Sequence, residues 1–178
     1  MRKSPPLPCP ARSSSLRRPP DPLIRSAGGG MAAALSILSR DRRGPQIARQ
    51  ILLMPMLDDR NTTPDPHIAP LAVWTYDDSR TAWPALLGDA AGGPGVPATA
   101  TPARLENATD LPPAYLEIGQ IAAFRDEASA YAITLSRAGV PVEFHLHPGV
   151  PHEFDSIAFN ADVSRRAIAD RIRVLKSI

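Results

Sequence analysis

Hydrophobic positions along the chain follow a helical period in some segments and form short continuous apolar runs in others. The first helix is predicted from apolar residues at helical spacing, namely Met31, Ala34, Leu35 and Leu38. Gly44-Pro45 ends that pattern, and the apolar run 51–54 then predicts a buried strand. Residues 61–113 are rich in Pro, Gly, Thr and Asp, which predicts loops around one helix near Asp78 to Leu87.

The second half of the chain repeats a strand-then-helix order. Residues 114–118 predict a strand closed by Gly119, and Val142 to His147 predict another. Apolar residues at helical spacing predict one helix between these strands and one after them, marked by Phe124, Ala128, Tyr131, Leu135 and Ala138, and by Val163, Ala167, Ile168, Ile172 and Leu175. Strands alternating with such helices predict the α/β class, with a parallel sheet of about three strands.

The first 22 residues differ from the rest in composition. They hold seven of the 21 prolines, five Lys or Arg and a single acid, Asp21. Such a segment buries too little apolar surface to offset its ordering entropy, so we expect a disordered tail over 1–22 and a folded body over 23–178. A targeting role is the alternative, although the prolines oppose the amphipathic helix of a transit peptide.

Composition and charge narrow the classes of partner. The 178 residues are 43% hydrophobic and 21% charged with a net charge of +2, which suits one soluble domain. The basic residues gather at the start, so we expect no nucleic-acid surface. No apolar run reaches the roughly 18 residues of a membrane span, and Cys9 alone cannot form an internal disulfide. We expect a cytoplasmic protein.

Two segments carry candidate chemistry. Ser26 begins a small-residue segment, 26–30, at the start of a predicted helix. A serine in a tight turn there can be exposed as a nucleophile, with the Ala27 amide as an oxyanion donor. The same segment could instead cradle a phosphate or serve helix packing. His152 follows the third predicted strand, where an imidazole can act as a base, although a loop histidine can also be merely solvated.

A metal site is a rival interpretation. His145 and His147 lie two residues apart on a strand and so share a face, and His152, Asp58 and Asp59 could converge on them. The alternative is an edge strand that directs Val142, Phe144 and Leu146 to the core and Glu143, His145 and His147 to water. We favour the second interpretation and expect neither a metal nor a cofactor.

Six segments together resemble the hormone-sensitive-lipase-like carboxylesterases, a branch of the α/β hydrolases. In chain order they are SAGGGMAAALSILSRDR, QILLMPMLDDRN, WPALLGDAAGG, LPPAYLEIG, FRDEASAYAITLSRAGVPVEF and HPGVPHEFD. They run from residue 26 to residue 155, and the resemblance implies that the body, 23–178, is the C-terminal half of such a domain. It also implies Ser26 as nucleophile, Ala27 as one oxyanion donor, His152 as general base, and small to medium acyl esters as substrates.

Three departures from the family pattern bear on activity. Ile24 replaces the first glycine of the Gly-x-Ser-x-Gly turn, and residues 1–25 contain nothing like the family's His-Gly-Gly-Gly oxyanion motif. Ala122 stands where the resemblance places the acid of the catalytic triad. Asp126, one helical turn further on, is a possible stand-in, and the alternative for it is a solvated acid at a helix start.

These departures predict a weakly active or inactive esterase. The alternatives are a non-catalytic binding module built on the same fold, and a fragment of a full-length esterase. The strand near residue 51 is expected to expose an apolar edge, so a partner chain that covers this edge is a further expectation.

Overall fold

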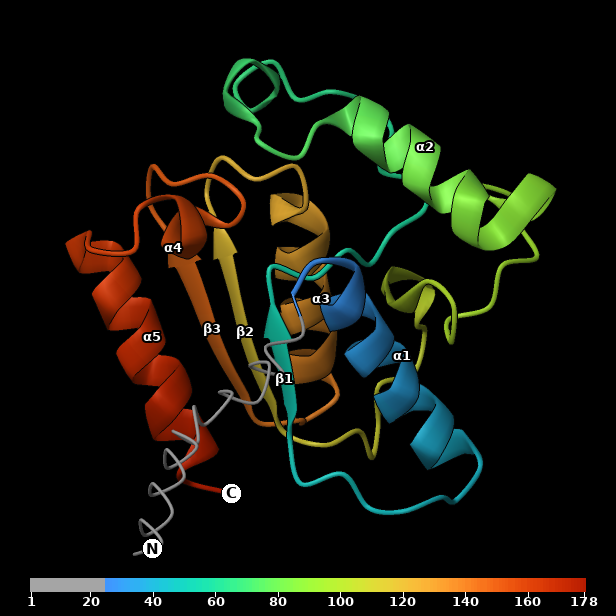
Figure 1. Cartoon of the computed structure of the whole chain (residues 1–178). Coiled ribbons are helices and arrows are strands. Elements are labelled where there is room, and N and C mark those ends of the chain that lie inside the picture. Colours follow the sequence, from blue (N-terminus) through green and yellow to red (C-terminus); the bar gives the residue numbers. More distant parts are fainter. Residues whose placement is uncertain (1–24) are drawn as a thin grey trace, which may run out of the picture.

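A computed structural model describes residues 25–178 of the chain (Figure 1). The helices and strands are, in chain order, α1 (Ala27–Asp41), β1 (Gln50–Leu53), α2 (Tyr76–Leu87), β2 (Ala114–Gly119), α3 (Arg125–Arg137), β3 (Val142–His147), α4 (Phe154–Ile157) and α5 (Asp162–Leu175). The expected tail, 1–22, and Cys9 lie outside the described residues.

The three strands form one parallel sheet in the order β1-β2-β3. Leu52 of β1 is paired with Leu116 of β2, which is paired in turn with Phe144 of β3. The predicted class, α/β with a short parallel sheet, is therefore confirmed. The strand predicted over 51–54 lies one residue earlier, and α4 was not predicted.

Helices cover both faces of the sheet (Figure 1). On one face, α1 and α3 bury the apolar side chains of Leu52 and Leu116, with Ile37 and Leu135 in the same cluster. On the other face, α5 covers the opposite side chains of the strands, and its Val174 packs against Leu53 and Tyr115. The alternation of side chains along each strand thus serves two helical layers.

The helix predicted from Met31, Ala34, Leu35 and Leu38 is present, but those residues do not form its buried face. Met31 is 71% exposed and Leu35 57% exposed, whereas Ala33 and Ile37 are buried. The four predicted residues line an apolar groove of about 950 Å³ beside β1. Ile172 and Leu175 of α5 border the same groove and are also exposed. The pattern thus located the helices correctly but marked a groove wall, not the core.

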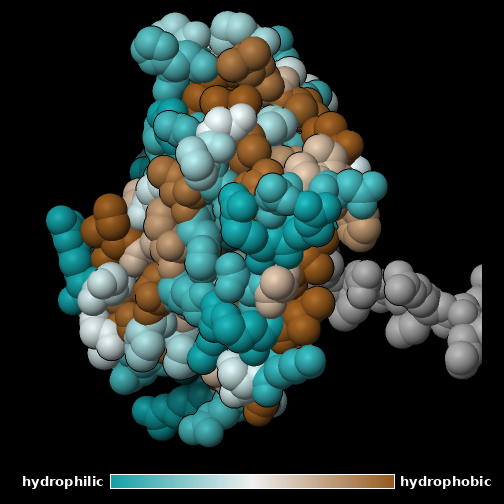
Figure 2. All heavy atoms as spheres, turned by 90° about the vertical axis from the view of Figure 1, so that its left-hand side faces the viewer, coloured by the Kyte–Doolittle hydropathy of each residue, from teal (hydrophilic) through white to brown (hydrophobic). Residues whose placement is uncertain are grey.

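The groove follows the outer edge of β1. Ile51 and Leu53 line it, and Leu53 also forms an isolated parallel bridge with Arg25. Among the described residues, this bridge is the one backbone pairing on the outer edge of β1. On the face that α5 presents, brown hydrophobic atoms are interspersed among hydrophilic ones (Figure 2).

The predicted burial of the β3 side chains was wrong at two positions. Leu146 was expected in the core but is 45% exposed. The side chain of His147, expected in water, is largely covered and lies against Phe154 with ring centroids 5.0 Å apart. The reason is that α4 and α5 cover the histidine face of the sheet, while the cluster beneath α3 does not extend to Leu146.

No helix within residues 25–178 combines the length and the apolar character that crossing a bilayer requires.

The start of α1 packs so closely on the chain after β1 that a methyl group is expected to disrupt it. A Cβ built on Gly30 would lie 2.2 Å from the carbonyl oxygen of Met56. We expect Gly30→Ala to lower the free energy of unfolding by about 1–3 kcal/mol, because backbone must move to admit the methyl group. Chemical denaturation measures the change.

Gly95→Ala is the matched control, since its Cβ would meet no atom within 4 Å. This control should be neutral or slightly stabilised. Equal unfolding midpoints for the two variants would contradict the close approach at Gly30.

Candidate active site

Ser26 occupies a strained turn between the sheet edge and α1. Its φ of 52° and ψ of −120° place a residue with a side chain in a region that favours glycine. Hydrogen bonds hold it there: its N–H donates to the carbonyl of Leu53 over 3.1 Å, and its own carbonyl accepts from Met56 and Gly30. The Ser26 side chain therefore stands at the carboxyl end of β1, where parallel sheets place their ligands.

The N–H of Ala27 lies next to Ser26 at the start of α1. Ala27 is the first residue of α1 and is exposed. The N–H groups of a first helical turn lack intrahelical acceptors and lie at the positive end of the helix dipole. An oxygen that becomes negative near Ser26 would be stabilised by such a donor.

His152 is buried in the loop after β3. Its side chain is 3% exposed, and neither ring nitrogen has a hydrogen-bond partner among the described residues. The ring packs edge-on against Phe124 at 5.2 Å and lies 6.4 Å from the ring of Trp74. Burial lowers the pKa of His152 below its ordinary value. The imidazole is therefore neutral near pH 7, which is the form a general base requires.

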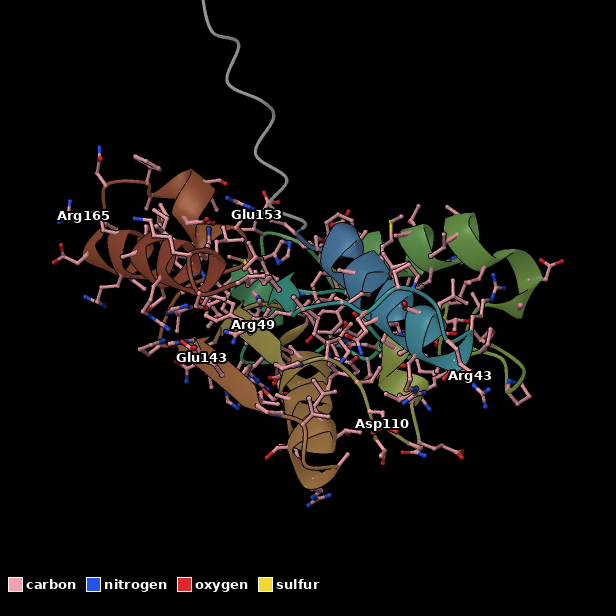
Figure 3. All side chains as sticks on the ribbon, turned by 90° about the horizontal axis from the view of Figure 1, so that it is seen from below. Arg43, Arg49, Asp110, Glu143, Glu153 and Arg165 are labelled. Carbon is pink, nitrogen blue, oxygen red and sulfur yellow. The ribbon has the colours of Figure 1, made fainter. Side chains whose placement is uncertain are left out.

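The structure brings the Ser26 turn and the His152 loop to the same end of the sheet. Met54 directly follows β1, and its sulfur accepts the N–H of Glu153 over 3.0 Å. The Arg25 side chain forms an ion pair with Asp155, three residues after His152. Seen from below, Glu153 lies between α4 and α1 (Figure 3). Ser26 Oγ is buried without a hydrogen-bond partner in the described part of the chain, so it is not bonded to the imidazole.

The position expected for the triad acid is apolar. Ala122 is buried in the turn after β2, in a cluster with Phe124 and Phe154. Asp126 is the second residue of α3, and its side chain is 75% exposed and paired with Arg125. Its carboxylate therefore lies at the surface and makes no hydrogen bond to His152.

The residues of the rival metal site do not come together as one group. Within residues 25–178 no group of three or more His, Cys, Asp or Glu side chains could hold a metal ion. Asp58 pairs with Arg60, and Asp59 pairs with Arg104.

A buried chain of charges near the site was not predicted. Glu117 of β2 binds Arg171 of α5, Arg171 binds Asp155 of α4, and Asp155 binds Arg25 beside Ser26. Two signals in the sequence pointed to it. Glu117 interrupts an apolar strand, and Arg171 occupies a buried helix position between Ala167 and Val174. A charge at a buried position needs a partner of opposite sign.

Known proteins resemble this chain in sequence and in fold. Residues 25–156 match a family described as the alpha/beta hydrolase fold. Esterase LipI of Mycobacterium tuberculosis (strain ATCC 25618 / H37Rv) is 33% identical over 138 residues, which cover 72% of this chain and 40% of LipI. Among solved structures, a bacterial heroin esterase has a TM-score of 0.74 and 36% identity, covering 82% of this chain and 47% of that protein. Esterase LipW from Mycobacterium marinum has a TM-score of 0.73 and 29% identity, covering 85% and 47%.

The chain therefore belongs to the α/β-hydrolase fold family. Within it, the resemblance to the hormone-sensitive-lipase-like esterases is confirmed. The chain spans less than half the length of these relatives.

The buried imidazole predicts a pH dependence of stability. Because burial lowers the folded-state pKa of His152, the unfolded chain binds more protons between that pKa and 6.5. The free energy of unfolding should therefore fall as the pH drops through this window. His152→Phe lacks this contribution, so its loss of stability from about pH 7.5 to about pH 5.5 should be smaller, by about 1.4 kcal/mol for each unit by which the pKa is lowered.

Urea unfolding of the two proteins at each pH measures this difference. Parallel losses in wild type and His152→Phe would contradict a buried, neutral imidazole.

Proposed function

We propose that this chain carries the serine and histidine of a carboxylic ester hydrolase. Ser26 Oγ attacks the ester carbonyl, His152 takes the hydroxyl proton and returns it to the leaving alcohol, and water then hydrolyses the acyl-serine. The Ala27 N–H donates to the oxyanion. The observation that carries the proposal is the strained Ser26 turn, which stands at the same end of the sheet as a buried, unpaired imidazole.

The proposed activity is low because the base lacks an acid to orient it. In a complete triad a carboxylate accepts the second N–H of the imidazole and fixes its tautomer, and neutralising that carboxylate costs about 10⁴ in turnover. The corresponding position here is Ala122, and Asp126 is engaged by Arg125 at the surface. Such a loss corresponds to about 5–6 kcal/mol of transition-state stabilisation.

We further propose small to medium acyl esters as the substrate class. The similar proteins LipI and LipW are named as esterases, and one similar structure is a heroin esterase. Trp74 lies beside both His152 and Phe124, so an acyl chain held near the serine would meet an aromatic wall.

A fluorophosphonate probe tests whether Ser26 is activated. We expect slow but specific labelling at Ser26, because the probe requires an activated hydroxyl. Peptide mass spectrometry locates the adduct, and Ser26→Ala should abolish it. Ser129→Ala, on a helix away from the turn, is the matched control and should label like wild type.

An absence of labelling at Ser26, with the protein shown to be folded by circular dichroism, would refute the proposal and favour a non-catalytic binding module.

Restoring a carboxylate at the vacant position should raise the activity. In Ala122→Asp, the new acid can accept a hydrogen bond from the buried imidazole, so we expect labelling and hydrolysis of a p-nitrophenyl ester to rise about tenfold or more. Ala122→Asn has nearly the same shape without the charge and is the matched control. Equal rates for the two variants would contradict the assignment of position 122.

A further inference from the structure

Arg25 links the turn that carries Ser26 to the segment that carries His152. Its backbone forms the parallel bridge with Leu53, and its carbonyl accepts the N–H of Gly28 over 2.8 Å. Its guanidinium reaches α4, where Nη1 donates to Asp155 Oδ1 at 3.1 Å and to Ser156 Oγ at 2.6 Å, and Nη2 lies 2.9 Å from Asp155 Oδ2. One residue is thus fixed to the sheet edge by its backbone and to α4 by its side chain.

Asp155 is held from two sides. Its side chain is 1% exposed, and Arg171 of α5 binds the same carboxylate that Arg25 binds. Arg171 is itself anchored to Glu117 in the middle of β2. The charges of two carboxylates and two guanidinium groups therefore cancel. A planar guanidinium that binds both oxygens of a carboxylate fixes the orientation of the pair as well as its distance. Removing Arg25 leaves α4 tied to α5 but no longer to the serine turn.

The position of His152 depends on where α4 is anchored. Glu153 separates His152 from α4 and adopts a left-handed conformation, with φ 56° and ψ 26°. This short, constrained connection transmits the position of Asp155 to the imidazole. The ring makes no hydrogen bond of its own within the described residues, so it is restrained by packing against Phe124 and Trp74 and by the α4 anchor.

We propose that Arg25 is a positioning residue, whose two-pronged bond to Asp155 and hydrogen bond to Ser156 hold the His152 loop beside the Ser26 turn. This inference rests on the proposed function, because the positioning serves the proton transfer between those two residues. The Gly-x-Ser-x-Gly pattern leaves the position before the serine unspecified, so the role follows from the contacts of this chain.

The test compares Arg25→Gln and Arg25→Lys with Arg165→Gln. Arg165 is an exposed arginine that pairs with Asp162 on α5, so its loss changes the net charge equally without touching the site. Two quantities are measured: the rate of fluorophosphonate labelling at Ser26, and the position and titration of the His152 ring signals in ¹H–¹³C NMR spectra. His152→Phe assigns those signals.

Arg25→Gln is expected to slow labelling on the order of 10–100-fold, because small displacements of reacting groups have effects of that size. It should also shift the His152 signals and raise the pKa of His152, since the charge of Arg25 lowers that pKa while Glu153 and Asp155 raise it. Arg25→Lys keeps the positive charge but loses the planar guanidinium. Relative to Arg25→Gln, it should therefore restore the pKa of His152 more fully than the labelling rate at Ser26. Arg165→Gln should match wild type in both measurements.

Unchanged His152 signals and an unchanged pKa in Arg25→Gln would overturn the inference, whatever the labelling shows. If wild type is not labelled, the proposed function fails, and the NMR comparison alone decides whether Arg25 positions the imidazole. If Arg25→Gln does not fold, Ser156→Ala replaces it, since that variant removes one hydrogen bond and no charge. Shifted His152 signals in Ser156→Ala would then support the inference, and unchanged signals would overturn it.

Discussion

The hydrogen bond from the N–H of Ser26 to the carbonyl of Leu53 holds the start of α1 against the end of β1. Met54 and Met56, which follow Leu53 closely in the chain, extend this junction. Met54 donates its N–H to the carbonyl of Glu117 and accepts the N–H of Glu153 on its sulfur, and Met56 donates to the carbonyl of Ser26. The serine turn, β2 and the histidine loop are therefore located relative to one short stretch of backbone.

The energetic balance of the buried ion chain differs from that of the apolar core. Burying Glu117, Arg171 and Asp155 costs solvation free energy, which is recovered only when each charge keeps its partners and its hydrogen bonds. Such a network adds little net stability compared with apolar side chains of the same volume. Its effect is geometric, because the hydrogen bonds are satisfied in one arrangement of α4, α5 and β2. This arrangement fixes α4, which directly follows the loop that carries His152.

The sequence predicted the elements well and the environment of their side chains less well. The order of strands and helices followed from periodicity, because each element buries enough apolar residues to leave a pattern; α3 is the clearest case, with Ala128, Tyr131 and Leu135 all buried. Periodicity failed to predict the exposure of Met31 and Leu35, because an apolar position in the sequence can face either the core or a surface groove. It also missed α4, whose four residues are too few to show a helical period.

The sequence suggested residues for the candidate site but not the contacts that support them. The resemblance pointed to Ser26, Ala27 and His152 because those positions lie within continuous sequence blocks, and to Ala122 because it lies in the short gap between two blocks. The contact between Arg25 and Asp155 joins residues 130 positions apart, and no local pattern encodes such a pairing. Long-range charge pairs of this kind are fixed by the tertiary fold, so coordinates were needed to find them.

The two edges of the sheet differ in how they would meet another molecule. Along β3, Glu143 is bound by Arg173 and by His145, and charged side chains of this kind discourage a further strand from adding there. The described part of the β1 edge has apolar walls instead. Within residues 25–178, charged side chains therefore mark one edge strand of the sheet, and apolar side chains line the groove beside the other. A contact made through one edge strand alone joins two copies about a two-fold axis, whereas growth into a ribbon requires strand addition at both edges.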